Sequence, residues 1–323
     1  MPSFRTGTVT RLLAARPGLQ RVEVDGEAAY VLTELIGGVE IGDRVVINTT
    51  AVELGLGTGG WHVVHWNLSR DTWHPRSPGH VMKLRYTSLQ TNLEVAEERL
   101  ADPTAMPDLE GMPVVACALH SQIAVAAAVF KHLVPQRRLV YVMTDGGGLP
   151  LVLSDLLAEL CSAGLIDSTV TCGHAFGGDY EAVTVASALQ VARELARADA
   201  VVAGIGPGAV GTGSALGHSG LDVAAIVDAA AHLQARPIVA VRFSSADSRE
   251  RHRGVSHHTT AALRLIAADP LVPEPDEATP DGAALLAARG IEVKTMGRGP
   301  DEDPDFFRYA AAAGAAAAAC TVA

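Results

Sequence analysis

Hydrophobic and polar positions follow two different patterns along the chain, and the change falls near Met112. Before it, short runs typical of β-strands flank Asp25-Gly26, a dipeptide typical of a tight hairpin turn. No helical period of useful length appears over residues 1–75. We therefore expect a small all-β domain, a barrel or a sandwich, over residues 1–75, followed by a connector over 76–112.

After Met112, continuous apolar runs alternate with amphipathic stretches. Strands of a parallel sheet are continuously apolar because helices cover both faces of the sheet. The fold expected for 113–323 is therefore α/β, a doubly wound, mostly parallel sheet of about six strands. The expected strands are 114–119, 139–144, 169–172, 200–205, 238–241 and 291–294, with helices at 121–133, 150–163, 180–198, 221–234, 256–268 and 281–289.

Composition and charge narrow the classes of partner. Lys and Arg number 25 against 36 Asp and Glu, a formal net charge of −11, which argues against nucleic acid because its binders carry a basic surface. No apolar run reaches the ~18 residues of a spanning helix. The first residues lack a signal sequence, and the four cysteines are widely spaced. We expect a cytoplasmic protein without membrane association, and its alanine-rich helices are compatible with a homodimer.

Histidine, aspartate, arginine or clustered glycine residues follow five successive apolar runs. In open α/β sheets, ligands bind beyond the carboxyl ends of the strands. The opposite ends of the same runs carry ordinary turns, so the asymmetry predicts a functional site at the carboxyl edge. The candidates for catalysis there are His120, Asp145, His174, Asp179, His257 and His258.

A glycine-rich segment, residues 206–220, follows the fourth of these runs, and its first six residues match G-x-G-x-x-G. Pro207 removes a backbone N–H, and Arg242 ends the next run where NAD binders place an acid. Classical NAD(P) binding is therefore less favoured than a backbone-lined site for phosphate or carboxylate. Glycines needed only for tight turns are the alternative. The ligand-binding residues expected here are Gly206, Gly208, Gly211, Thr212 and Gly213.

An arginine-rich segment, residues 242–258, carries four arginines against Asp247 and Glu250. A positive patch in an acidic protein concentrates anions, and arginine grips phosphate or carboxylate at two points. Ser256 precedes a helical pattern as an N-cap would, which adds donors at the same place. A solvated loop with internal ion pairs is the alternative. The ligand-binding residues expected here are Arg242, Arg249, Arg251 and Arg253.

Two chemistries are open for the histidines. A Zn or Mn site would take two or three histidines and an aspartate, with one position left for water. No HExxH-like spacing fixes two ligands locally, so the cofactor stays unknown, with a divalent metal as one option. Alternatively, one histidine held by an aspartate acts as a general base without metal. Histidines that only cap strands are the third interpretation.

Six runs, GHVMKLRYTSLQ, ALHSQ, YVMTDGGGLP, GHAFGGDYEAV, GPGAVGTGSALG and RHRGVSHHT, resemble an uncharacterised bacterial family found mainly in actinobacteria and related Gram-positive lineages. The resemblance extends from about Thr6 to about Gly299 and implies one integrated protein with no established activity. From the residues we expect an enzyme, a hydrolase or transferase, that acts on a small phosphorylated or carboxylated substrate. The alternatives are a non-catalytic regulatory protein that binds a nucleotide or metabolite, and a Zn- or Mn-dependent hydrolase.

Overall fold

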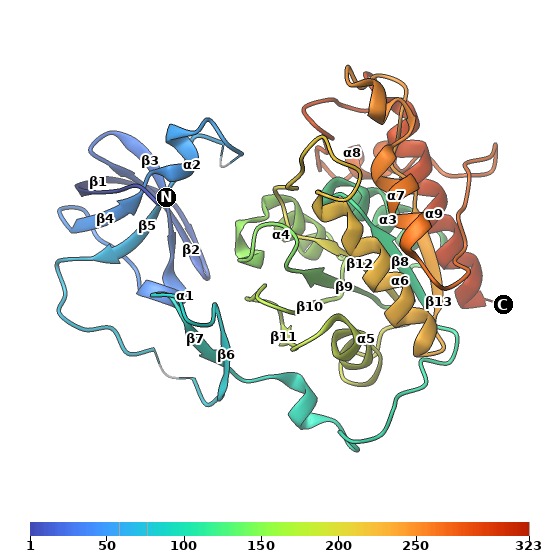
Figure 1. The fold of residues 1–323 in the computed structure, drawn as a ribbon, viewed down its shortest axis with the longest axis horizontal. Coiled ribbons are helices and arrows are strands. Elements are labelled where there is room, and N and C mark those ends of the chain that lie inside the picture. Colours follow the sequence, from blue (N-terminus) through green and yellow to red (C-terminus); the bar gives the residue numbers. More distant parts are fainter. Residues whose placement is uncertain (58, 76, 323) are drawn as a thin grey trace. The chain divides into compact units, whose positions relative to one another are not determined.

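The chain forms two compact units, Met1–Glu94 and Val95–Ala323, in a computed structural model that describes residues 1–57, 59–75 and 77–322 (Figure 1). The segment 76–112, expected as a connector, divides between these units. The four cysteines are free thiols. Within the described residues, no helix combines the length and the apolar character that crossing a bilayer requires.

The first unit is a closed barrel in its described part, with strand order β1-β2-β3-β5-β4. Bulges near Val9 and Leu12 bend the long first strand, so that it pairs with both β2 and β4. The Asp25-Gly26 turn has positive φ at both residues, as the hairpin prediction requires. The strands are β1 (Phe4–Arg16), β2 (Leu19–Val24), β3 (Glu27–Leu32), β4 (Arg44–Asn48) and β5 (His62–Asn67), accompanied by α1 (Thr33–Ile36), α2 (Thr50–Glu53), β6 (Val81–Lys83) and β7 (Thr91–Leu93).

The second unit is built on a sheet in which every pair of neighbouring strands is parallel, with order β11-β10-β9-β12-β8-β13. This confirms the doubly wound α/β prediction. The strands are β8 (Pro113–Cys117), β9 (Leu139–Thr144), β10 (Ser168–Thr171), β11 (Tyr180–Glu181), β12 (Ala200–Ile205) and β13 (Arg236–Ala240).

Helices cover both faces of this sheet (Figure 1). Alternate residues of β8 divide between two cores, Val115 and Cys117 in one and Val114 and Ala116 in the other. The first core includes α3 (His120–Leu133), α4 (Asp155–Ser162), α8 (Gly282–Ala287) and α9 (Pro304–Val322); the second includes α5 (Val185–Glu194), α6 (Asp222–His232) and α7 (His257–Leu265). The short elements between them are η1 (Ala96–Arg99), η2 (Leu151–Leu153), η3 (Ser219–Leu221), η4 (Glu250–His252), β14 (Phe243–Ser244) and β15 (Gly254–Val255).

One predicted strand is wrong. Ile291 and Val293 are buried in the core beside α8 and α9, but they join no sheet. The place of the sixth strand is taken by β11, only two residues long, at the edge of the sheet. An apolar run identifies a buried segment, and it does not by itself distinguish a strand from irregular chain packed under a helix.

Candidate functional site

The carboxyl edge of the parallel sheet gathers most of the sequence-predicted positions. His120, Asp145, His174, Gly206 and Arg242 all lie just beyond the carboxyl ends of β8, β9, β10, β12 and β13. Strands β9 and β12 are neighbours in the sheet, and the helices that follow them, α4 and α6, lie on opposite faces of it. A sheet of this kind opens a crevice at such a point, so this edge is where a ligand is expected.

Asp179 lies at the other end of the strands. Its carboxylate accepts a hydrogen bond from the backbone N–H of Thr169 at 2.8 Å and from the hydroxyls of Ser168 and Thr169 at 3.0 Å. These residues begin β10, so Asp179 fixes the chain between β10 and β11 at the amino-terminal edge. The structure therefore does not bring it to the other candidates.

His120 holds three segments of the carboxyl edge together. Its Nδ1 lies 3.3 Å from the carbonyl oxygen of Ile205, which can only accept, so this nitrogen carries the proton. Its Nε2 therefore accepts from the Ser154 hydroxyl at 2.7 Å, and that hydroxyl in turn caps α4. Burial lowers the pKa of His120 to about 4. A neutral imidazole with both nitrogens used inside the protein is a structural link between β8, β12 and α4.

Asp145 and His174 meet through backbone geometry. The Asp145 carboxylate accepts the backbone N–H of His174 at 2.9 Å. A second carboxylate, Asp222, accepts a hydrogen bond from the Thr144 hydroxyl at 2.7 Å, and burial raises the pKa of Asp222. These two acids and His174 form a polar group above β9 and β10, and Asp222 was absent from the sequence prediction because it follows no strand directly.

The glycines after β9 and β12 are explained by close packing of two backbones. A Cβ at Gly147 would lie 2.4 Å from the carbonyl oxygen of Gly206, and a Cβ at Gly206 would lie 2.3 Å from that of Gly148. The N–H of Gly148 also donates to the Pro207 carbonyl oxygen at 2.6 Å. The start of the glycine-rich segment therefore fills the crevice between β9 and β12 with the chain itself.

The rest of the glycine-rich segment folds back on itself. The N–H of Thr212 donates to the carbonyl oxygen of Gly217 at 2.7 Å, and that of Ser219 to the oxygen of Val210 at 2.8 Å. The N–H of Val210 donates to the Ser219 hydroxyl at 3.1 Å. These bonds use several of the donors that an anion would need. They also position His218, near the end of the segment, beside His257 and His258.

Four histidines pack together beyond β8 and β13, and we call them the histidine cluster: His218, His252, His257 and His258. The rings of His218 and His258 stack at 3.7 Å with an interplanar angle of 9°. The His257 ring lies 4.4 Å from that of His258, at 67°. Three members are nearly buried, at 7% exposed for His218, 2% for His252 and 8% for His258, and His257 is half-buried.

The local sequence fixes the positions of these rings. Ser256 caps α7 by accepting the backbone N–H of His258, which sets His257 and His258 on its first turn. The Ser256 hydroxyl also lies 2.7 Å from Nδ1 of His252, so the same residue fixes the orientation of that ring. Arg242 donates from Nη1 to Nδ1 of His258 at 2.9 Å. Because arginine stays protonated, His258 must accept through that nitrogen.

Burial keeps the histidine cluster uncharged. Desolvation, with the positive charge of Arg242 second, lowers the pKa of His252 to about 4 and that of His258 to about 2. Burial also lowers the pKa of His218 and of His257. At neutral pH the cluster therefore presents neutral imidazoles, whose lone pairs can accept protons or bind a metal ion.

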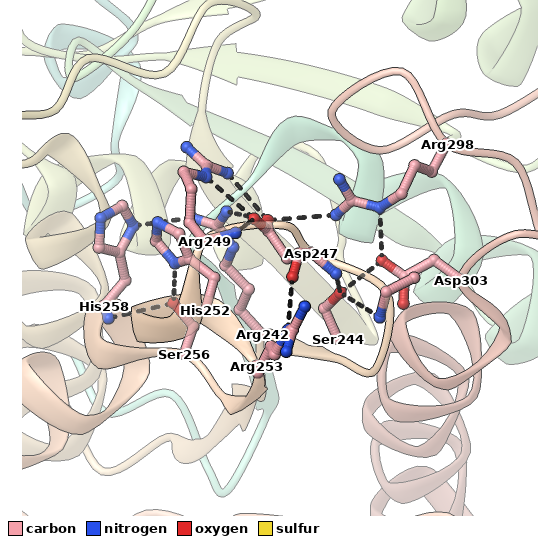
Figure 2. A network of polar contacts seen from close by, with 11 residues as sticks. Arg242, Ser244, Asp247, Arg249, His252, Arg253, Ser256, His258, Arg298 and Asp303 are labelled. Atoms are coloured by element: carbon pink, nitrogen blue, oxygen red, sulfur yellow. Dashed lines mark hydrogen bonds and ion pairs between the residues drawn. The ribbon is translucent and has the colours of Figure 1, made fainter.

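Beside the cluster, arginines surround two buried carboxylates (Figure 2). Asp247 is 1% exposed, and its carboxylate accepts hydrogen bonds from Nε and Nη2 of Arg249 at 2.9 Å and from Nη2 of Arg298 at 3.2 Å. Nε of Arg298 also donates to Asp303 at 3.0 Å. Hydrogen bonds from Arg249 hold the pKa of Asp247 well below its usual range. Arg242 lies 3.8 Å from Asp247 and joins this network to the histidine cluster.

The predicted anion-binding arginines therefore differ in what they contact. Arg249 is bonded to the Asp247 carboxylate, and Nε of Arg253 donates to the Asp247 carbonyl oxygen at 3.0 Å. Arg242 is 4% exposed and bonded to His258, and burial lowers its pKa to about 10, so it stays charged. Arg251 is exposed, and no ion pair joins it to a residue that the structure describes.

Sequence reasoning missed two members of the histidine cluster and one arginine. His252 lies inside the segment whose other residues were singled out, and its four-residue spacing from Ser256 was an available signal. His218 lies near the end of the glycine-rich segment, in which the sequence predicts a binding role only for glycines and Thr212. Arg298 is far along the chain, and only the fold brings it to Asp247.

The fold and this edge define a class: an α/β protein with an N-terminal barrel, whose parallel sheet carries a histidine- and arginine-rich candidate site at its carboxyl edge. The chain belongs to the family described as "Protein of unknown function (DUF3866)", whose model matches residues 28–282. This confirms the resemblance to an uncharacterised family, and the match includes the whole histidine cluster. Neither a curated protein nor a solved structure matches the chain.

Proposed function

We propose that the protein is an enzyme that hydrolyses, or transfers a group from, a small phosphorylated or carboxylated substrate at the histidine cluster. The observation that carries this proposal is the packing of four imidazoles, one of them bonded to Arg242, at the carboxyl edge of the sheet. Burying so many polar nitrogens costs free energy that an apolar core would not, and such groups gather at functional sites.

Charge supports an anionic substrate. The first unit has nine basic and nine acidic side chains, so the net charge of −11 belongs entirely to the second. Within that acidic unit, the segment 242–258 presents an exposed arginine, Arg251, beside the cluster. Arg251 also contributes to the lowered pKa of His257, after burial and the charge of His218. A phosphate or carboxylate placed here would meet both residues.

The most accessible member of the cluster is His257, and we assign to it the contact with the reacting group, made by its ring or by a metal ion bound to that ring. In hydrolysis, water would attack the substrate's phosphorus or carbonyl carbon and pass a proton to a neutral ring nitrogen of the cluster. A divalent metal ion held by these histidines would make that water more acidic. The bond to the leaving group would break, and the leaving group would take a proton from solvent. Arg251 would bind the anion throughout, without taking part in proton transfer.

The test is a turnover screen with the full chain. Sugar phosphates, nucleoside monophosphates and p-nitrophenyl esters of phosphate and acetate are supplied with Zn²⁺, Mn²⁺ or Mg²⁺, and products are measured by mass spectrometry. We expect His257→Ala to lower kcat about 100-fold or more and Arg251→Ala to raise KM about tenfold, the effect of ~1.4 kcal/mol of lost binding. His232→Ala, an exposed histidine at the end of α6, is the matched control.

Binding of several of these anions without turnover, under every metal, would favour the non-catalytic regulatory alternative and reject the enzyme. Equal turnover by wild type and His257→Ala would show that the reaction, if any, happens elsewhere.

A further inference from the structure

We propose that the histidine cluster binds one divalent transition-metal ion, with His218 and His257 as its first two ligands and His258 as the third. This inference deepens the proposed function, because it names a cofactor for the same site. Metal binding itself can be measured without any turnover, so the two proposals can fail separately.

Two buried nitrogens in the cluster lack hydrogen-bond partners. These are Nδ1 of His218 and Nε2 of His257, within the part of the chain that the structure describes. One ring nitrogen from each of His218, His257 and His258 lies within 4.8 Å of the other two. A buried polar atom without a partner is costly, so such atoms usually meet a water or an ion. Two such nitrogens among these three neighbouring rings indicate a ligand that both of them bind.

The tautomer of His218 is the one that a metal ligand needs. Its Nε2 lies 3.1 Å from the carbonyl oxygen of Ala215, which can only accept a hydrogen bond. The ring proton is therefore on Nε2, and Nδ1 carries an available lone pair. Metal-binding histidines commonly donate their other N–H to a backbone carbonyl in this way, which fixes the ring orientation.

The chain leaves room beside these nitrogens. A Cβ at Gly220 would lie 3.2 Å from Nδ1 of His218 and 3.4 Å from Nδ1 of His258. The backbone of Gly220 does not itself require glycine, because its φ lies outside the positive region. Absence of a side chain at this position therefore keeps the space in front of both nitrogens open.

Arg242 competes with the metal ion for His258, the third ligand. Its Nη1 donates to Nδ1 of His258 at 2.9 Å, and that ring is stacked on His218 at 9°. Lone pairs lie in the ring planes, so two stacked rings do not point at one ion. His258 must leave Arg242 and rotate to bind the metal. Arg242 keeps a second partner, Asp247 at 3.8 Å, toward which it can turn.

The donor set selects the class of metal. All three ligands are neutral imidazoles, which suit Zn²⁺, Co²⁺, Ni²⁺ and Cu²⁺ and are poor ligands for Mg²⁺ or Ca²⁺. Three histidines would leave a fourth position for water or substrate, the arrangement of catalytic zinc sites. No aspartate belongs to this group of described residues, so the site proposed here consists of histidines alone, unlike the mixed histidine–aspartate set that the sequence left open as one option.

The experiment titrates Co²⁺ into the chelator-treated full chain and follows visible d–d absorption, with Zn²⁺ competition to obtain affinities. We expect one ion per chain. His218→Ala and His257→Ala should each weaken binding at least as much as loss of an outer-shell partner does, about 10- to 100-fold. Gly220→Ala should weaken it while leaving all ligands present, and His232→Ala should bind like wild type. Circular dichroism and urea unfolding verify that each variant is folded.

The Arg242→Met variant gives the sharpest readout, because the competing guanidinium is gone and His258 is free to turn. It should bind Co²⁺ more tightly than wild type, whereas a site built only for anions would be weakened by the same change. Absence of Co²⁺ and Zn²⁺ binding by wild type, or equal binding by wild type, His218→Ala and Gly220→Ala, would overturn the metal site. A metal-loaded protein that turns over no ester would retain this inference and reject the proposed function.

Discussion

The glycine-rich segment 206–220 and the arginine-rich segment 242–258 looked equally suited to hold an anion, yet the fold uses them differently. In the first, Gly206 packs against the backbone after β9, and the residues from Val210 to Ser219 bond mostly to one another. In the second, arginines and histidines converge on residues from elsewhere in the chain, and Nε2 of His257 remains without a partner among the described residues. Residue type shows what a loop is able to bind, and the contacts that its residues already make show how many of its groups are left for a ligand.

The contacts of the arginine-rich segment depend most on Asp247. We expect Asp247→Ala to lower the free energy of unfolding by about 3–5 kcal/mol, because it leaves the buried Arg242 and the partly buried Arg249 and Arg298 without a shared carboxylate. Urea unfolding at equilibrium measures the change. Glu250→Ala removes an exposed acid from the same segment and should change stability by less than about 0.5 kcal/mol. Equal unfolding midpoints for the two variants would show that the network of Figure 2 does not organise this segment.

A second test concerns His120, which anchors the start of the glycine-rich segment at Ile205. Its pKa falls from 6.5 to about 4 on folding, so the folded chain favours the neutral ring. The resulting stability is fully present above pH 6.5 and is lost as the pH falls toward 4, to a total of at most about 3 kcal/mol. Urea unfolding across this range should therefore show a steeper loss for wild type than for His120→Gln, whose side chain does not titrate.

Parallel curves for wild type and His120→Gln would mean that water reaches His120 in the folded chain. The link between β8, β12 and α4 would then be weaker than its hydrogen bonds suggest.

The smallest expected effect separates two glycines of one segment. Gly206→Ala places a Cβ 2.3 Å from the Gly148 carbonyl oxygen, and the backbone shift it forces should cost about 2 kcal/mol. A Cβ at Gly213 meets nothing within 4 Å, so Gly213→Ala should leave stability nearly unchanged. Thermal and urea unfolding compare the pair. If both variants are equally stable, the glycine contacts between β9 and β12 do not hold the crevice closed, and anion binding at Gly206 becomes the better interpretation.

Much of the fold was predictable because burial in a parallel sheet leaves a continuous apolar run. The strands β9 and β12 coincide with their predicted limits, and the hairpin turn at Asp25 was readable from two residues. The run at Ile291 failed, because apolar chain under a helix has the same signature as a strand. For the site, periodicity located the edge of the sheet. It did not identify His218 as a neighbour of His258, since that pairing depends on how the segment 206–220 folds back.

The residue before α9 has a consequence for how the protein is made. Asp303 accepts the Ser244 hydroxyl at 2.7 Å and Nε of Arg298 at 3.0 Å, and Arg298 in turn reaches Asp247. During synthesis on the ribosome, the loop after β13 emerges well before these late partners. This network of hydrogen bonds and ion pairs then stays incomplete until residue 303 has left the exit tunnel, and prematurely terminated chains are released with that loop untethered.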